Sequence, residues 1–388
     1  MYVPKIFYTR EKIMLKVGFI GYGNRSNHLW TNMFVPVGGC ELVAIADPKW
    51  ETIKELHAED FPNCHYYVDA EEMLKNEKLD GVIIGTSCDL HTKYALLVEK
   101  YGLPLFLEKP VSINEEQLRE LETILPTMNE KTVVSFPLRI TDIVMKVKEM
   151  LDSGIIGEIA HVQAINNVNY GRVYYHGWYR DDKRTGGLWV TKATHDLDYI
   201  TNILGLGLPV SVCAMESKMV FKGDKPAGLT CKECPEYETC PESAQYLSYI
   251  DTEYGAYCCY ATDTGNQDSG TVILEYKNGL HVVYSQNFIV RKSAGKRGAR
   301  FIGVKGTLEF DFNTSTITFI DHYSDKVETI TLPNKHGHSG GDDYLVRSFI
   351  DVMQGTGPSV ATLEDGINSV KVCFACKRSA ETHTYQAP

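Results

Sequence analysis

The sequence of 388 residues lacks two features that would place it at a membrane or on a nucleic acid. No segment approaches the roughly 18 consecutive apolar residues of a membrane span. The 39 basic residues are outnumbered by 50 acidic ones, and a net charge of −11 disfavours binding to a phosphate backbone. The N-terminus also lacks the apolar core and cleavage site of a secretory signal. We therefore expect a cytoplasmic protein with no membrane or nucleic-acid partner.

The length exceeds what one hydrophobic core usually organises, so two domains are expected. In the first part of the chain, short apolar runs alternate with stretches of helical periodicity. This alternation predicts a parallel sheet covered by helices on both faces, which binds ligands at the carboxyl ends of its strands. The five apolar runs are residues 16–23, 41–48, 80–87, 103–110 and 131–139.

The first strand-to-helix turn reads GYGNRS and matches a dinucleotide-binding fingerprint, with Ser26 in place of the third glycine. Gly21 suits the tight turn, and Gly23 allows the backbone to approach a pyrophosphate. Asp47, at the end of the next strand, is placed to bind the ribose hydroxyls, which favours NAD over NADP. The alternative is a Rossmann-like domain that binds another ligand. The expected cofactor contacts in the turn are Gly21, Gly23, Asn24, Arg25 and Ser26.

The fourth apolar run ends in Leu107-Glu108-Lys109-Pro110, an unusual strand ending. A positioned amine can take the hydroxyl proton when a secondary alcohol is oxidised, or stabilise the alkoxide that develops. Partial burial beside a cationic nicotinamide would lower the pKa of this amine toward a useful value. The alternative is a surface salt bridge at a strand end.

Together with the later segment GGLWVTKATHDLD, these motifs resemble the glucose–fructose oxidoreductase / inositol dehydrogenase / MocA family over nearly the whole chain. The resemblance implies an N-terminal Rossmann domain (1–138) and a C-terminal α+β domain (139–388) with a large, mostly antiparallel open sheet. It also implies that Lys109 contacts the nicotinamide ribose and the substrate, held by Glu108 and Pro110. Thr86, Glu108 and His91 are then expected at the cofactor, and the open sheet is expected to bury itself in a homo-oligomer, a dimer or tetramer.

The sequence pattern from about Gly154 onward supports such a second domain. Longer alternating segments rich in aromatic residues predict a half-buried antiparallel sheet, with a hairpin turn at Asn278-Gly279. A helix starting near Thr191 would place Thr191, Lys192 and His195 on one face.

Family members usually carry an aspartate at the position of Thr191, so this chain lacks that carboxylate partner. We interpret His195 as a general base or proton relay. Lys192 is interpreted as a second catalytic cation that orients hydroxyls or an anionic substituent. Further candidate substrate contacts, each equally open to a packing role, are Arg139, His176, Trp178, Arg180, Thr191 and His338.

Three cysteines follow one another closely in an insertion at about residues 222–260. The set Cys231, Cys234 and Cys240, completed by Cys258, would suit a closed structural zinc site. Free thiols and, less favourably, an iron–sulfur cluster are the alternatives.

The leading hypothesis is an NAD-dependent dehydrogenase of a sugar, sugar derivative or cyclitol, with NADP as the less favoured cofactor. A second is an NAD-dependent glycoside hydrolase, which oxidises a sugar carbon transiently and eliminates the aglycone. A third is a dinucleotide-binding protein without catalytic activity.

Overall fold

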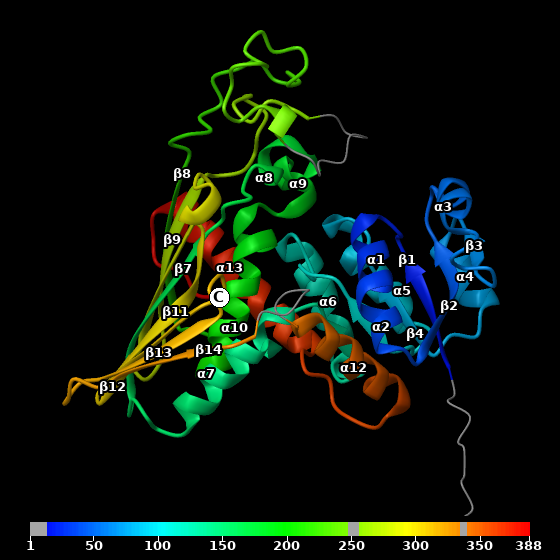
Figure 1. The fold of residues 1–388 in the computed structure, drawn as a ribbon. Helices are drawn as coiled ribbons and strands as arrows, with labels where there is room; N and C mark the ends of the chain where they lie inside the picture. The colour runs from blue at the N-terminus through cyan, green and yellow to red at the C-terminus, as the bar shows by residue number, and fades with distance from the viewer. Residues whose placement is uncertain (1–13, 247–255, 334–339) are drawn as a thin grey trace, which may run out of the picture.

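The computed structural model describes residues 14–246, 256–333 and 340–388. Two sheets lie at opposite sides of the molecule, with helices between and around them (Figure 1). The first sheet has six parallel strands in the order β3-β2-β1-β4-β5-β6, and the second has eight in the order β14-β13-β12-β11-β7-β10-β9-β8. The expected α/β architecture is confirmed.

The first sheet and its helices occupy the N-terminal third of the chain. The central strands β4 and β5 are buried at every residue, as expected for a parallel sheet covered on both faces. The elements are β1 (Leu15–Ile20), α1 (Asn24–Leu29), α2 (Val35–Val37), β2 (Cys40–Ala46), α3 (Trp50–His57), β3 (His65–Tyr67), α4 (Ala70–Asn76), β4 (Gly81–Ile84), α5 (His91–Glu99), β5 (Leu105–Leu107), α6 (Glu115–Met128) and β6 (Thr132–Val134).

The second sheet is antiparallel except where β7 pairs with β10. The expected hairpin is confirmed, with Gly279 in the left-handed region at φ 87° between β9 and β10. The elements are α7 (Asp142–Asp152), β7 (Ile159–Asn167), α8 (Val173–His176), α9 (Asp182–Thr185), α10 (Thr194–Leu204), β8 (Ser211–Ser217), β9 (Ser269–Glu275), β10 (His281–Asn287), β11 (Lys296–Gly303), β12 (Gly306–Asp311), β13 (Thr316–Asp321), β14 (Val327–Thr331), α12 (Gly341–Gln354) and α13 (Leu363–Thr382).

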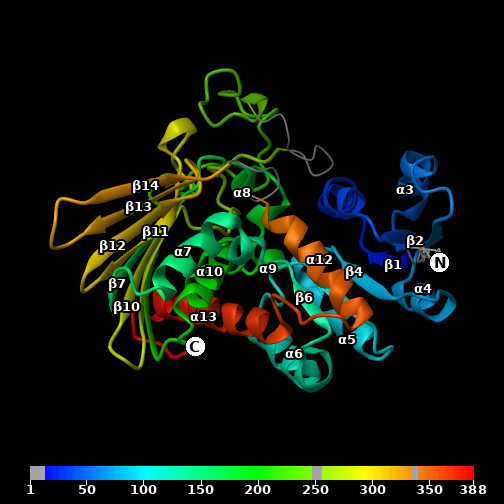
Figure 2. The ribbon, with the colours of Figure 1, turned by 60° about the horizontal axis from the view of Figure 1, so that its bottom comes forward.

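One face of the second sheet packs against α7, α10 and α13, while the other is open (Figure 2). Strand β9 shows the consequence, because buried residues alternate with exposed ones along it. Ile273 and Met215 on this open face are 46% and 72% exposed. No helix in the described ranges is long and apolar enough to cross a membrane.

Helix α12 returns from the C-terminal part of the chain to cover the first sheet (Figure 2). Phe349 of α12 packs edge-on against Phe34 and Phe106, with ring centroids 6.3 and 5.7 Å apart. Gly81 allows this approach, since a Cβ there would lie 2.5 Å from the sulfur of Met353. The core of the N-terminal domain therefore depends on a helix that the linear division at residue 138 assigned to the second domain.

Candidate functional site

The turn between β1 and α1 has the backbone that the fingerprint requires. Gly21 adopts φ 80°, and a Cβ there would lie 2.9 Å from the backbone of Thr86. The Ser26 hydroxyl donates to the carbonyl oxygen of Gly21 at 2.9 Å and to that of Gly85 at 3.3 Å. Serine therefore performs the packing role of the third glycine and ties the turn to the end of β4.

The residues around this turn fit a dinucleotide. No atom lies within 4 Å of the position that a Cβ on Gly23 would take, so the backbone there is open to a pyrophosphate. Asn24 and Gly23 are both exposed, as a cofactor contact requires. The Asp47 carboxylate accepts hydrogen bonds from the backbone N–H groups of Tyr22 at 2.9 Å and Lys49 at 2.8 Å. These bonds fix a carboxylate beside the turn, where a ribose would lie.

Glu108 connects the fingerprint helix to the end of β5. Its buried carboxylate accepts from Arg25 Nε at 2.9 Å and from the Ser135 hydroxyl at 3.1 Å. Arg25 also lies 3.8 Å from Asp342 at the start of α12. Glu108 and Arg25 therefore link α1, the end of β5 and the start of α12 at the carboxyl edge of the sheet.

His91 lies behind this edge and braces two strand-end loops. Its Nδ1 lies 2.7 Å from the carbonyl oxygen of Pro110, and its Nε2 lies 3.1 Å from that of Thr86. Burial lowers the pKa of His91, so the ring is neutral near pH 7 and can donate to one carbonyl at a time. The structure thus places His91 as a support for the Lys109-Pro110 loop, in contrast to the nicotinamide contact that we expected.

Lys109 follows β5 directly and joins the two domains. Its Nζ donates to the carbonyl oxygen of Thr191 at 3.0 Å, and the Lys109–Pro110 peptide is cis. Burial lowers the pKa of Lys109 to about 8, against the opposing influence of Cys88 and Glu108. A buried amine with this pKa can gain or lose a proton near neutral pH.

The segment that carries the other predicted catalytic residues starts with a π-helical turn, Trp189–Ala193, before α10 begins at Thr194. The Thr191 hydroxyl donates to the carbonyl oxygen of Gly187 at 2.9 Å, and the backbone carbonyl oxygen of Thr191 accepts the hydrogen bond from Lys109. His195 is 7% exposed, and its ring meets Phe136 edge-to-face at a centroid distance of 6.4 Å. Because π-turns widen the helical spacing and occur often at functional sites, the backbone supports the functional interpretation of this segment.

A network that we had not expected lies next to Lys192. Its Nζ donates to the Tyr170 hydroxyl and lies 4.6 Å from the centre of that ring. Asp196, one turn along α10, pairs with Arg297 Nε at 2.7 Å. The same carboxylate accepts from Asn166 at 2.7 Å and from Tyr284 at 2.9 Å. These three contacts tie α10 to β7, β10 and β11 through Asp196.

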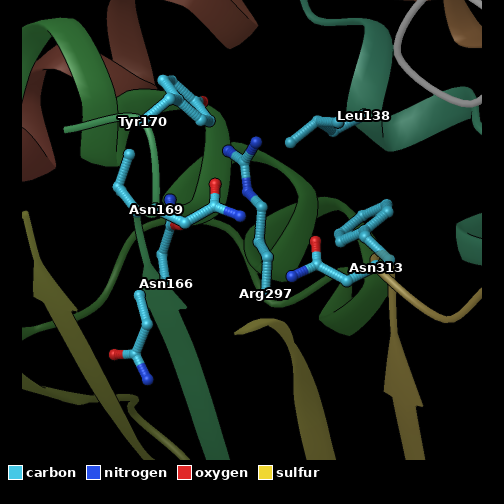
Figure 3. Close-up of a pocket in the computed structure, with 9 residues that line it drawn as sticks. Leu138, Asn166, Asn169, Tyr170, Arg297 and Asn313 are labelled. Carbon is cyan, nitrogen blue, oxygen red and sulfur yellow. The ribbon is translucent and has the colours of Figure 1, made fainter. Parts of the chain in front are cut away.

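Tyr170 and Arg297 line a cavity of about 180 Å³ (Figure 3). The guanidinium of Arg297 reaches between Tyr170 and Leu138, and Asn169 and Asn313 flank it. The sequence carries one signal of this cavity. The stretch Asn166-Asn167-Val168-Asn169-Tyr170 places polar side chains at the end of a strand, although nothing in the linear order connects it to Arg297.

Three predicted substrate contacts, Arg139, His176 and Arg180, instead form contacts within the protein. Arg139 is the first of them. Arg139 forms ion pairs with Asp198 of α10 and Asp365 of α13, the latter at 2.8 Å. It also donates to the carbonyl oxygen of Val360 at 3.2 Å. Little of its side chain, 5%, is exposed to a ligand.

His176 and Arg180 likewise form contacts within the protein, with residues in or next to the cysteine-containing insertion. His176 is fully buried, and its Nδ1 lies 2.6 Å from the carbonyl oxygen of Tyr257. Burial lowers the pKa of His176 to about 4. Arg180 pairs with Asp263, and its Nη2 donates to the hydroxyl oxygen of Thr264 at 2.9 Å.

Trp178 is half-buried and remains available to a ligand. It stacks on Tyr179, with centroids 4.0 Å apart, and Arg184 lies 5.7 Å from the indole. His338, the last predicted substrate contact, lies outside the described residues.

The predicted zinc site is not supported. Across residues 14–246, 256–333 and 340–388, no group of three or more His, Cys, Asp or Glu side chains could hold a metal. Burial first, and neighbouring thiols second, raise the pKa of Cys231 and Cys258. Cys231, Cys234, Cys240 and Cys258 form no disulfide within the described residues.

Known proteins resemble the chain along its whole length. The Gfo/Idh/MocA descriptions "Oxidoreductase family, NAD-binding Rossmann fold" and "Oxidoreductase family, C-terminal alpha/beta domain" match residues 15–136 and 148–387. The oxidoreductase YteT of Bacillus subtilis (strain 168) is 26% identical over 320 residues, which are 72% of this chain and 74% of YteT.

Two further similarities cover almost the whole chain. D-glucoside 3-dehydrogenase of Escherichia coli (strain K12) is 22% identical over 370 residues, which are 95% of this chain and 96% of that protein. The fold also matches levoglucosan dehydrogenase, solved with NADH and levoglucosan, with a TM-score of 0.75 at 15% identity. That match covers 96% of this chain and 99% of the other.

Replacing Arg139 by Met tests its structural role. The substitution leaves the buried carboxylate of Asp198 unpaired, so we expect a loss of about 3–5 kcal/mol in the free energy of unfolding. Urea unfolding followed by circular dichroism measures it. Arg347→Met, at an exposed position of α12, is the matched control and should change stability by less than about 0.5 kcal/mol. An unchanged midpoint with a raised substrate KM would instead identify Arg139 as a substrate contact.

Proposed function

Because the chain belongs to the Gfo/Idh/MocA oxidoreductase family, we propose that it is an NAD-dependent dehydrogenase of a sugar, sugar derivative or cyclitol. The substrate carbon that loses hydride carries a secondary hydroxyl. The observation that carries this proposal is the half-buried amine of Lys109, with a pKa of about 8, at the carboxyl edge of a sheet that also presents the fingerprint turn.

The proposed mechanism assigns the hydroxyl proton to the chain's own residues. NAD, when bound, supplies the carbon that accepts the hydride. Lys109 Nζ takes the proton from the hydroxyl as the carbonyl forms, and His195 passes protons between the substrate and solvent. Lys192 adds positive charge that stabilises the developing alkoxide. Gly23, Asn24 and Asp47 are proposed to hold the dinucleotide, and Thr191 and Trp178 to border the substrate.

Removing the amine should separate chemistry from cofactor binding. Lys109→Met keeps the alkyl stem but deletes the proton acceptor, so we expect kcat to fall by roughly 10²- to 10⁴-fold. The affinity for NADH, measured by fluorescence titration, should change little. Lys100→Met, at an exposed residue after α5, is the control. Normal turnover of the Lys109 variant would refute the assignment.

The same residue sets the expected pH dependence. In the direction of alcohol oxidation the amine must be neutral, so kcat/KM should rise with pH and level off above about 8. In the direction of ketone reduction the ammonium must be present, so kcat/KM should fall across the same range. Steady-state rates in both directions provide the measurement, and Lys109→Met should lack both transitions.

Cofactor preference should depend on Asp47. Its carboxylate accepts ribose hydroxyls and repels a 2′-phosphate, so Asp47→Ser should weaken NAD binding by roughly tenfold or more. It should also improve the affinity for NADP. Dissociation constants for both cofactors, with Lys49→Ala as the control at the neighbouring exposed residue, provide the test. Tighter binding of NADP than of NAD by the unmodified protein would contradict the proposal.

A second candidate, glycoside hydrolysis through transient oxidation, has one observation in its favour. Elimination of an aglycone needs a proton acceptor besides the one that serves the hydroxyl, and Lys192 is a second buried amine whose pKa is lowered by burial. Incubation with aryl glycosides separates the two functions. A dehydrogenase forms one NADH for each ketone and releases no aglycone, whereas a hydrolase releases aglycone without accumulating NADH.

A further inference from the structure

We propose that the cavity beside Arg297 is a carboxylate subsite and that the natural substrate is an acidic saccharide. This inference rests on the proposed function and specifies its substrate class. The subsite consists of the Arg297 guanidinium, the Tyr170 hydroxyl supported by Lys192, and the side chains of Asn169 and Asn313.

Arg297 presents an unused donor to the cavity. Its Nε is occupied by Asp196, which leaves the terminal edge of the guanidinium for a ligand (Figure 3). In the described part of the chain, Nη2 is buried without a hydrogen-bond partner. A buried guanidinium nitrogen without a partner is costly, and the terminal edge of arginine matches a carboxylate in a bidentate geometry.

Lys192 and Tyr170 provide a second donor. Because the ammonium of Lys192 donates to the phenol oxygen, the Tyr170 O–H is directed away from Lys192 and can donate to an anion. The hydroxyl of a neutral Tyr170 therefore adds a hydrogen bond beside the guanidinium. Tyr170 itself is 45% exposed and borders the cavity, so a ligand can reach it.

The electrostatic balance favours an anion. Three charged groups face Tyr170. Lys192 belongs to the π-helical turn before α10, Asp196 to α10 and Arg297 to β11. The phenol of Tyr174 in α8 also faces it. Asp196 is the one carboxylate among them, and it is already shared by Arg297, Asn166 and Tyr284. Two cations thus face one anion.

The titration of Tyr170 agrees with this balance. Desolvation of the phenol oxygen opposes its ionisation, although the residue as a whole is 45% exposed, and the charges of Lys192 and Arg297 outweigh this and lower the pKa of Tyr170. A position that stabilises a phenolate also stabilises a carboxylate.

The space fits a saccharide longer than one ring. A second hollow of about 680 Å³ shares Asn167, Asn169 and Asn313 with the cavity and adds Lys292, Lys296 and Asp311 to its lining. Lys296 is paired with Glu309 at 3.2 Å and Asp311 adds a negative charge, so this outer hollow gives room for further sugar units without selecting acidic ones.

The test compares sugars that differ only at one carbon. Glucose, galactose and mannose are titrated against their uronic acids by calorimetry, with and without NADH. We expect at least one uronic acid to bind tenfold or more tightly than its neutral partner. Gluconate tests an aldonic acid, and glucose 6-phosphate tests a phosphate. Equal or weaker binding of the acid in all three pairs, or a preference for the phosphate, would overturn the subsite.

Three variants locate the effect. Arg297→Met should reduce the preference for the acid by tenfold or more. Asn313→Asp, at an exposed residue of the cavity lining, should abolish the preference because it places a carboxylate beside the bound acid. Arg300→Met, on the opposite face of β11, should keep it. If Arg297→Met does not fold, Asn313→Asp decides, and an unchanged preference in that variant refutes the subsite.

The two proposals can fail separately. Failure to bind NADH would refute the dehydrogenase, while titrations without NADH would still measure the preference for the acid. Turnover of neutral sugars without any preference for acids would leave the dehydrogenase standing and remove the carboxylate subsite.

Discussion

The hydrogen bond from Lys109 to the carbonyl oxygen of Thr191 is the contact on which the site depends. It joins the carboxyl edge of the parallel sheet to the π-helical turn of the second domain. Burial at this junction lowers the pKa of Lys109, and the same junction brings Lys192 close enough to lower it further. An amine at the end of an isolated strand would stay solvated and protonated, so the second domain is required for the lowered pKa of Lys109.

The features that were predictable from the sequence are those governed by local physics. Short apolar runs become buried parallel strands because both faces of the sheet are covered, and Asn278-Gly279 becomes a hairpin turn because glycine tolerates a positive φ. The fingerprint turn and Lys109 were predictable because they lie at strand ends, where a parallel sheet binds its ligands. In these cases a few neighbouring residues contain the whole reason for the structure.

The remaining features depend on contacts between distant residues, which periodicity cannot reveal. Arg139 was expected in the cleft, but its partners Asp198 and Asp365 follow it by 59 and 226 residues. A buried arginine near two carboxylates is held by them wherever the chain brings them together. Tyr170 and Arg297 were missed for the corresponding reason, because only the pairing of β7 with β11 makes them neighbours.

The charge of the cleft differs in sign from the charge of the protein. The chain carries a net −11, yet Lys109, Lys192 and Arg297 are gathered where two domains meet. Keeping cations away from water is unfavourable unless anions offset them; Glu108, which Arg25 shares, partly offsets Lys109, and Asp196 pairs with Arg297. A carboxylate beside Arg297 would oppose the lowered pKa of Lys192. A charged Lys192 lowers the pKa of Lys109, so a bound acid would act on the Lys109 amine in two ways: its own charge would raise the pKa of Lys109, and the charge it preserves on Lys192 would lower it. Recognition of an acidic substrate and the proton affinity of Lys109 are therefore coupled through the same buried charges.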